Sequence, residues 1–343
     1  MTQLGVVIPT VNEADQLPKL LRQLREQTGI ELELVIADGG SSDATMQLAR
    51  DAGLEVVESA PGRARQMNRG AEITTSPWLL FLHADSSFSR TDQLAAAVQQ
   101  LKASHRQLGH QRVAGHFRLR FHRTRPGHDL AYRYYEEKSA LNRPECTNGD
   151  QGLLLSRSFF DQLGGFDESL WFLEDQRMAE KIRRQGHWIT LPGALGTSAR
   201  RFEQEGLGRR MLLSAMIMNL HAMGLHEFFR RSRSIYRTQS HTTKLRLGPV
   251  FSLLAELNRE AGPRISRRRW LASGRYACLH LWQLFFWLDI VLEGLGKRRR
   301  QLLPVYDRVI APRTDNHFCH LAAGGVVWIW FHATRLALKI IQD

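Results

Sequence analysis

The sequence has few cysteines, no leader-like start and no internal repeat or low-complexity linker. Its three cysteines (Cys146, Cys278 and Cys319) are too few and too scattered for a disulfide framework, which favours a reducing compartment. The first residues enter an apolar strand pattern without the basic segment of a signal peptide, so we expect a cytoplasmic protein. With 43% hydrophobic and 24% charged residues, the composition is that of a globular chain, and 343 residues suffice for one α/β domain plus an extension.

The positive charge is concentrated in the last third of the chain. The net charge is +13, and residues 226–343 hold 20 Lys and Arg against 8 Asp and Glu. Such asymmetry indicates a second functional unit with an anionic partner, either phospholipid or nucleic acid. The aromatic residues of this part lie inside apolar runs and do not alternate with the arginines as stacking platforms would, which argues against nucleic acid.

Apolar periodicity predicts strands and helices in alternation along the first eighty residues. We expect strands at Gly5–Pro9, Leu32–Ala37, Leu54–Glu58 and Trp78–Leu82, with helices at Ala14–Gln27, Ser42–Ala52 and Arg63–Ile73. This rhythm predicts a mostly parallel, Rossmann-like sheet with helices on both faces. Further along we expect an edge strand at Val113–Phe121, short strands at Leu153–Ser156 and Trp188–Leu191, and helices at His128–Leu141 and Asp175–Gln185.

Three polar clusters stand at strand or helix ends, where a doubly wound sheet binds its ligands. The first, Ala37–Asp43, offers Asp38 to a base N–H and Gly39 for close backbone approach; a tight turn with a helix cap is the equal alternative. The second, Phe81–Ser86, places His83 and Asp85 two residues apart, on one side of an extended segment. They can grip a divalent cation, although a strand that merely ends in polar residues is the slightly favoured alternative for this cluster alone.

The third cluster is Glu174–Asp175, two carboxylates that begin a helix after Trp171 and Phe172. Charges that favour the helix dipole explain such a pair, but a partly desolvated member can act as a general base. Between these clusters, residues 61–70 put glycine before basic and amide side chains at a helix start. That pattern suits a diphosphate cradle or a solvated basic helix face.

The order and spacing of these segments resemble family-two glycosyltransferases of the GT-A fold. The motifs are Val7-Ile8-Pro9-Thr10 with Asn12-Glu13, Asp38, His83-Ala84-Asp85 and Glu174-Asp175. A bacterial subgroup found near radical-SAM genes is closer still, through Gly62-Arg-Ala-Arg-Gln-Met-Asn, Leu82-His-Ala-Asp, Gly149-Asp-Gln-Gly and Thr197-Ser-Ala-Arg-Arg-Phe. The resemblance covers about residues 1–237. It implies a GT-A domain there and leaves 238–343 as a basic, apolar, helical extension.

The resemblance also implies a role for each matching residue. Asp175, with Glu174, would deprotonate the acceptor hydroxyl in an inverting displacement, and Asp85 would hold Mg²⁺ or Mn²⁺ at the diphosphate. His83 stands where many relatives carry an aspartate, so the metal has a single predicted protein carboxylate. The predicted donor-site residues are Pro9, Thr10, Glu13, Asp38, Gly39, Arg63, Arg65, Gln66, Asn68, His83 and Ala84. The predicted sugar or acceptor residues are Asp150, Gln151, Trp171, Arg200 and Arg201, although an exposed basic pair explains the two arginines equally well.

The extension contains two apolar runs, Leu279–Leu295 and Leu321–Ile341, flanked by basic clusters. Polar residues within both runs, and basic residues at both ends of the first, argue against membrane spans. The second run places His332, Arg335 and Lys339 on one helical face, which favours an amphipathic helix at a membrane interface. A subdomain that supports the catalytic domain or forms a homo-oligomer is the alternative. His317 and His320 lie in a tract that we interpret as ordinary surface.

We therefore expect a glycosyltransferase that moves a sugar from a nucleotide-sugar donor, with UDP-sugar favoured, to an acceptor hydroxyl, as a peripheral protein on the inner face of the cytoplasmic membrane. A soluble glycosyltransferase acting on a small metabolite is the same-fold alternative. A non-catalytic nucleotide-sugar-binding scaffold is the alternative from another class, and the intact Asp85 and Glu174–Asp175 argue against it.

Overall fold

The computed structural model describes residues 2–170, 172–239, 244–296 and 300–341. By its internal contacts the chain forms two compact units, one made of residues 1–123 and 131–199, the other of 124–130 and 200–343. The second unit begins earlier than the predicted boundary at 237/238, because helices of the 200–239 segment pack on those that follow. Asn219 donates from Nδ2 to Oγ of Ser273 at 2.9 Å, and Arg231 pairs with Glu256 at 2.7 Å.

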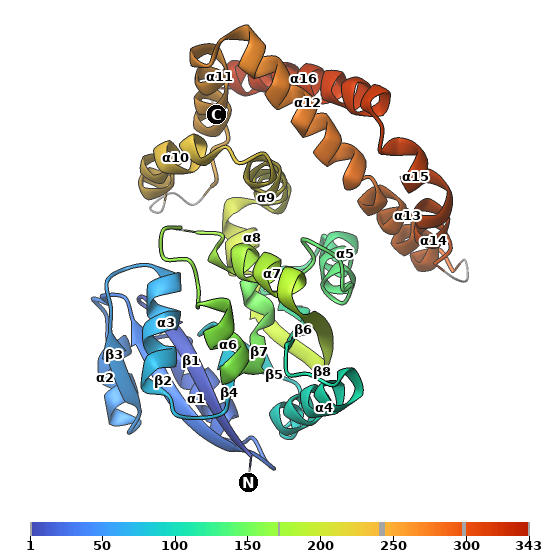
Figure 1. Ribbon diagram of the computed structural model, residues 1–343. Helices are drawn as coiled ribbons and strands as arrows, with labels where there is room; N and C mark the ends of the chain where they lie inside the picture. The colour runs from blue at the N-terminus through green and yellow to red at the C-terminus, as the bar shows by residue number, and fades with distance from the viewer. Residues whose placement is uncertain (1, 171, 240–243, 297–299, 342–343) are drawn as a thin grey trace. The chain divides into compact units, whose positions relative to one another are not determined.

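The first unit is built on one mixed sheet of strands in the order β3-β2-β1-β4-β7-β6-β8-β5 (Figure 1). The strands are β1 (Gln3–Thr10), β2 (Glu31–Asp38), β3 (Glu55–Glu58), β4 (Trp78–Phe81), β5 (Ser87–Phe88), β6 (Val113–His122), β7 (Leu153–Ser156) and β8 (His187–Ser198). β1 to β4 are parallel, β7 runs antiparallel to both β4 and β6, and β8 is parallel to β6. The fold is thus the predicted α/β class, with an antiparallel strand inserted after β4.

Helices cover both faces of this sheet. They are α1 (Leu17–Arg25), α2 (Thr45–Asp51), α3 (Arg63–Ile73), α4 (Gln93–Leu108), α5 (Asp129–Ser139), the 3₁₀ turn η1 (Gly149–Gln151), α6 (Arg157–Leu163) and α7 (Glu174–Gln185). One core cluster joins Leu4, Val6 and Ile8 of β1 to α1 and α4, and the other joins Val7 to α3, α6 and α7. The alternation of side chains along β1 therefore divides the core into two layers.

Two predictions about the later strands are corrected. The segment predicted as an edge strand, β6, lies between β7 and β8; its alternation reflects one partly solvated face, on which Arg118 and Arg120 are exposed. β8 is also longer than the predicted Trp188–Leu191. The sequence analysis missed α4, although its buried Leu94, Val98 and Leu101 have helical spacing.

The second unit is helical in the part of the chain that the structure describes. Its elements are α8 (Arg200–Glu205), α9 (Leu207–Ala222), α10 (His226–Gln239), α11 (Gly248–Glu260), α12 (Gly262–Leu279), α13 (Trp282–Gly294), α14 (Leu302–Val305), the π-helical turn η2 (Tyr306–Ile310), α15 (Ala311–Thr314) and α16 (His317–Ile340). α12 and α16 pack so closely that a Cβ on Gly274 would lie 2.1 Å from the His320 carbonyl oxygen and 2.3 Å from the Gly324 nitrogen. Glycine is therefore required at position 274 for this packing.

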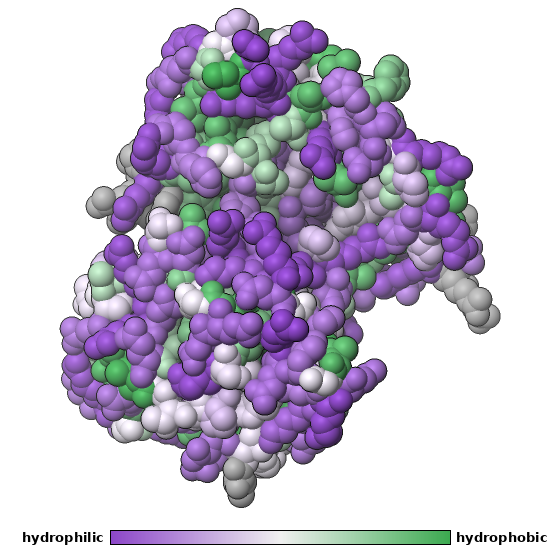
Figure 2. All heavy atoms as spheres, in the orientation of Figure 1, coloured by the Kyte–Doolittle hydropathy of each residue, from purple (hydrophilic) through white to green (hydrophobic). Residues whose placement is uncertain are grey.

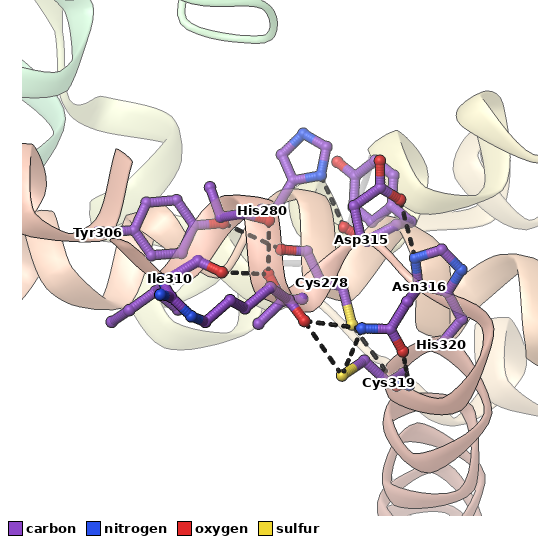
Figure 3. A network of polar contacts seen from close by, with 12 residues as sticks. Cys278, His280, Tyr306, Ile310, Asp315, Asn316, Cys319 and His320 are labelled. Atoms are coloured by element: carbon purple, nitrogen blue, oxygen red, sulfur yellow. Dashed lines mark hydrogen bonds and ion pairs between the residues drawn. The ribbon is translucent and has the colours of Figure 1, made fainter. Parts of the chain in front are cut away.

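A polar network fixes the beginning of α16 (Figure 3). Asn316 caps the helix by accepting the Cys319 N–H at 3.0 Å, and His320 lies 3.1 Å from Asp315. Tyr306 donates its hydroxyl proton to the Cys278 carbonyl oxygen at 3.2 Å. Within the described ranges, no group of three or more His, Cys, Asp or Glu side chains is arranged to hold a metal, and this histidine tract serves to join α12, η2 and α16.

Candidate functional site

The candidate site lies at the edge of the sheet where β1, β2 and β4 end. These parallel strands bring Thr10 opposite Asp38, and the residues after Phe81 follow at the same edge. Because β7 is antiparallel to β4 and pairs Leu153 with Phe81, the residues that precede β7 reach this edge as well. The antiparallel strand therefore brings η1, with Asp150, to the segment His83–Asp85 that follows β4.

Asp38 organises the loop after β2. Its carboxylate is fully buried and accepts hydrogen bonds from the Thr10 hydroxyl at 2.9 Å, the Gly40 N–H at 2.9 Å, and both the N–H and the hydroxyl of Ser41 at 2.7 and 2.5 Å. Burial alone would raise the pKa of Asp38, but these hydrogen bonds outweigh it and hold the pKa below its usual range. Asp38 is thus a carboxylate that shapes the loop, and its predicted contact with a base stays a prediction.

Gln66 ties the ends of β1 and β2 together from α3. It is 3% exposed, and its Nε2 donates to the carbonyl oxygens of Thr10 and Ala37, at 2.8 Å each. A Cβ on Gly39 would lie 2.9 Å from this amide, so glycine permits the close approach. The enclosed amide of Gln66 thus positions the loop, and its predicted role in lining a donor site stays a prediction.

Just beyond the end of β4, His83 and Asp175 flank Gly149 of η1. A Cβ on Gly149 would lie 3.2 Å from His83 Nε2 and 3.4 Å from Asp175 Oδ2, and the Gly149 N–H donates to Asp175 Oδ2 at 2.7 Å. Asp85 follows His83, and the Thr197 hydroxyl lies 3.5 Å from its Oδ2. The structure thus brings the second and third sequence clusters together.

The cluster also contains the carboxyl group of Asp150. Its Oδ1 is buried and, among the described residues, has no hydrogen-bond partner. Burial raises the pKa of Asp150 to about 7, and the negative charges of Asp175 and Asp85 add to the effect, while the Arg63 guanidinium opposes it. A cation at this point would replace the proton that Asp150 otherwise holds.

Glu174 is buried and bonded to Arg63. The side chain is 3% exposed, and its Oε1 lies 3.1 Å from Arg63 at the beginning of α3. Burial raises the pKa of Glu174, partly offset by the charge of Arg63. Within the Glu174–Asp175 pair, Asp175 is therefore the half-buried member beside the η1 loop, whereas Glu174 holds α3 to α7.

Gln151 is fully buried, and its side chain makes hydrogen bonds within the protein. Its Nε2 donates to the carbonyl oxygens of Ser139 at 2.8 Å and Phe117 at 3.2 Å, and its Oε1 accepts the Asn148 N–H at 2.6 Å. The predicted contact of Gln151 with sugar or acceptor stays a prediction. This amide fixes η1, so that the neighbouring Asp150 points into the cluster.

Two other predicted donor-site residues hold the loop before α7. Asn68 donates from Nδ2 to the Phe166 carbonyl oxygen at 3.0 Å and to Glu168 at 2.8 Å, and its Oδ1 accepts the Phe166 N–H at 2.8 Å. Arg65 lies 3.8 Å from the same Glu168, and both side chains are about half exposed. Arg65 retains a solvent-facing guanidinium on the first turn of α3, whereas Asn68 is committed to the loop.

The remaining predicted residues are placed as follows. Pro9 is half-buried near the end of β1, the Glu13 N–H donates to the Thr45 hydroxyl at 2.8 Å, and Ala84 is buried between His83 and Asp85. Trp171 lies outside the described residues. Arg200 and Arg201 begin α8 in the second unit, where Arg201 lies 3.4 Å from Glu205; their predicted contact with sugar or acceptor stays a prediction.

A small cavity of about 30 Å³ opens among these groups. Arg63, His83, Asn148, Gly149, Glu174 and Asp175 supply its polar lining. Its floor is apolar, with Phe81, Phe166 and Trp188. The cavity thus combines carboxylates, a guanidinium and an imidazole above an apolar floor, which suits the binding and positioning of a charged group.

The sequence analysis missed one part of this site, the support of the η1 loop. Gln176 donates from Nε2 to the Thr147 carbonyl oxygen at 2.9 Å and to Asn148 Oδ1 at 3.0 Å, and thereby joins α7 to the loop directly. The only signal in the sequence is the position of Gln176, two residues after Glu174 at a helix start.

Similarity to known proteins supports one family. A model of glycosyl transferase family 2 matches residues 5–164. A PGL/p-HBAD biosynthesis glycosyltransferase of Mycobacterium tuberculosis is 39% identical over 98 residues, which are 26% of this chain and 38% of that protein. A 4,4'-diaponeurosporenoate glycosyltransferase of Staphylococcus haemolyticus is 32% identical over 104 residues, 28% of each chain. The chain thus spans less than half the length of these relatives.

Two solved structures are similar at low sequence identity. TarS 1-349 of S. aureus in complex with UDP has 15% identity and a TM-score of 0.47, with 95% of this chain and 90% of that one covered. The mannosyltransferase PcManGT of Pyrobaculum calidifontis, in complex with GDP-Man and Mn²⁺, has 19% identity and a TM-score of 0.47, with 95% and 87% covered. The family model thus matches the segment that holds the Asp38 loop, His83–Asp85 and Asp150, and this part of the chain is similar to glycosyl transferase family 2.

Proposed function

We propose that the chain is a metal-dependent, inverting glycosyltransferase that passes a sugar from a nucleotide-sugar donor to an acceptor hydroxyl. The observation that carries the proposal is the meeting of Asp85, Asp150 and Asp175 beside the end of β4, where burial and mutual repulsion raise the pKa of Asp150 to about 7. Such crowding of carboxyl groups, in a segment that matches a family 2 model, fits a cation that accompanies a diphosphate.

The residues fit a divalent cation that is held partly by its substrate. Asp85 and Asp150 offer hard oxygen ligands, as Mg²⁺ and Mn²⁺ prefer, and the unpartnered Oδ1 of Asp150 is free to coordinate. Two carboxylates are fewer than a closed protein site needs, so oxygens of the donor diphosphate would complete the shell. When bound, the ion would neutralise charge on the leaving diphosphate.

The nucleotide would lie against the loop that Asp38 and Gln66 hold rigid. Thr10, Gly39 and Gly40 form the rim of this loop, and its backbone can approach a base or ribose closely because of the glycines. Arg63 and Arg65, on the first turn of α3, would face the phosphates with the helix N-terminus. A uridine nucleotide is the first candidate, on the resemblance to the family alone.

Asp175 would act as the general base. The Gly149 N–H holds its Oδ2 at 2.7 Å, and the pairing of Glu174 with Arg63 leaves Asp175 as the available carboxylate of the two. The acceptor oxygen would attack the anomeric carbon as its proton passes to Asp175. The bond from that carbon to the diphosphate breaks on the opposite side, which inverts the configuration.

We also propose that the helical unit binds the cytoplasmic face of a membrane. The segment Gly262–Gly294 and α16 are long and apolar enough to cross a bilayer, yet only 28% and 17% of their most apolar windows are buried. A core helix of a soluble protein would be mostly buried. Figure 2 shows hydrophobic side chains on the surface of this unit. On α16, Phe318 is 79% exposed, Val326 66% and Ile329 62%. With charges along α16, interfacial binding fits better than spanning.

A thermal-shift screen tests the transferase site. UDP, GDP, dTDP and CMP and their sugar conjugates are added with and without Mn²⁺ to the wild type, Asp85→Asn and Asp92→Asn. Asp92 is an exposed acid outside the cluster, paired with Arg90, and serves as the matched control. A ligand that binds the folded state raises Tm by mass action.

We expect one nucleotide class to raise Tm only with Mn²⁺, in the wild type and Asp92→Asn but not in Asp85→Asn. If no nucleotide shifts any folded variant, the donor site is refuted. If Asp85→Asn responds like the wild type, the metal assignment is refuted.

A further inference from the structure

The second unit contains a groove that the transfer chemistry does not use. It has a volume of about 580 Å³ and lies among α11, the first half of α12 and the middle turns of α16. Its polar lining includes Asn258, Arg259, Ser266, His332 and Arg335. Trp270, Trp328 and Phe331 form an aromatic wall. The groove is therefore amphiphilic, with cations and rings side by side.

The charge in the groove is positive. Glu256 is the one acid among the lining residues, against the two cations Arg259 and Arg335; outside the groove, Arg231 pairs with both Glu256 at 2.7 Å and Glu260 at 2.8 Å. The Nε of Arg335 is buried and, in the described part of the chain, has no hydrogen-bond partner. Leaving a buried guanidinium N–H unsatisfied is costly, so this atom indicates an anionic acceptor that fills the groove.

Two further features favour a phosphate. The first turn of α12 lines the groove beside the last turn of α11 and contributes Ser266, whose hydroxyl can donate a hydrogen bond to a phosphate oxygen. The imidazole of His332 also lines the groove and can donate a hydrogen bond to a ligand there. Guanidinium groups beside such donors suit a phosphate.

The apolar surroundings indicate what carries the phosphate. Trp328 is 46% exposed at the groove and continues into the exposed apolar stripe of α16, with Val326, Ile329 and Leu336. A free phosphate would use the cations alone, whereas a lipid places its phosphate on them and its acyl chains along the stripe. The exposed Arg264 and Arg268, on the same end of α12, add general attraction to an anionic surface.

We propose that this groove binds the phosphate of an anionic membrane lipid, with Arg335 and Arg259 as its ligands. The inference rests on the proposed membrane association and gives it a specific site, and it is independent of the transfer reaction. It differs from a general basic patch, because Arg335 lines the groove with a buried Nε.

Vesicle flotation of the full-length chain tests the proposal. Vesicles of phosphatidylcholine alone, or with phosphatidylglycerol, are mixed with the wild type, Arg335→Gln, Arg259→Gln and Arg268→Gln. Arg268→Gln removes the same charge from the same end of the unit outside the groove, so it is the matched control. Arg259 is exposed, so its variant stays informative if Arg335→Gln does not fold. Inorganic phosphate at matched ionic strength serves as the soluble competitor.

We expect Arg335→Gln and Arg259→Gln to weaken binding to phosphatidylglycerol vesicles by roughly tenfold or more, since a charge-assisted hydrogen bond is lost together with the charge. Arg268→Gln should cost at most about fivefold, the effect of one charge near the surface. Inorganic phosphate should displace the wild type more than it displaces Arg335→Gln.

Three outcomes would overturn the proposal. Equal losses in all three variants would mean that only general charge acts. Equal binding of all variants to neutral and anionic vesicles would preserve membrane association and refute the headgroup site. If inorganic phosphate raises the Tm of the wild type but no vesicle binds, the ligand is a soluble phosphate, and the membrane association fails as well. The nucleotide shifts, measured in parallel, report separately on the transferase site.

Discussion

The raised pKa of Asp150 predicts that Asp150→Asn stabilises the ligand-free protein, and increasingly so as the pH rises. The carboxyl group has a pKa of about 7 in the folded state against an ordinary value of 3.8. The unfolded chain therefore releases this proton at lower pH than the folded chain does, and the free energy of unfolding falls as the pH rises between these two values. An amide carries no such penalty.

The magnitude follows from the two pKa values. A difference of about three units, at 1.36 kcal/mol each, corresponds to roughly 4 kcal/mol above pH 8, little below pH 4, and about 1.5–2 kcal/mol at pH 5. The stabilisation by Asp150→Asn should thus grow by about 2–3 kcal/mol from pH 5 to pH 8. For a domain of this size, that adds roughly 5–10 °C to the difference in Tm.

Differential scanning fluorimetry of the wild type and Asp150→Asn at pH 5 and pH 8, with chelator present, measures this. Asp161→Asn is the control, because Asp161 is exposed on α6, away from the cluster. Equal effects of Asp150→Asn at both pH values, or destabilisation at pH 8, would refute the reasoning. With Mn²⁺ and nucleotide present, the wild type should be more stable than Asp150→Asn. The cation neutralises the Asp150 carboxylate in the wild type, whereas the amide of the variant gains no such stabilisation.

Three other substitutions test separate parts of the structure. Asp175→Asn should lower kcat by about 10²–10⁴-fold with nucleotide binding retained, once an acceptor is known, as expected for loss of a general base; a matching loss of nucleotide binding would contradict that role. Gln151→Ala should destabilise the first unit by roughly 3 kcal/mol in urea unfolding, because it leaves the buried Ser139 carbonyl and Asn148 N–H unpaired. Gly274→Ala should lower the free energy of unfolding by about 1–3 kcal/mol, because the added methyl group forces α12 away from α16. Gly325→Ala, with open space around its Cβ, is the control and should stabilise α16 by up to about 1 kcal/mol. Equal effects of the two substitutions would contradict the close packing.

Much of the first half of the fold could be predicted, because local signals and tertiary packing agree there. The helix at Arg63–Ile73 and the strand at Leu153–Ser156 have the predicted bounds, since glycine or serine marks their ends and apolar side chains fill their interiors. Strand order could not be predicted in the same way. The interior position of β6 depends on its pairing with β7 and β8, which no local pattern encodes.

The candidate site, like the fold, could be predicted only in part. Sequence motifs identified the segments around Asp38, Asp85 and Asp175, because their order matches a family. They did not show that the amides of Gln66 and Gln151 are turned inward, since a polar side chain beside a site has the same sequence signal whether it contacts a ligand or a carbonyl oxygen. Only the packed structure distinguishes the two.

The antiparallel insertion of β7 explains why this site is both charged and strained. If the strand beside β4 ran parallel, its first residues would lie at the opposite edge of the sheet, and Asp150 would never approach Asp85. The antiparallel direction of β7 brings the carboxylates together, and their electrostatic repulsion favours the protonated form of Asp150 in the folded chain. A cation with its diphosphate, as proposed, would relieve the same repulsion, so the free energy that destabilises the ligand-free state would favour binding of the donor. A variant stabilised at Asp150 should therefore bind donor less tightly, and the two changes should grow together as the pH rises.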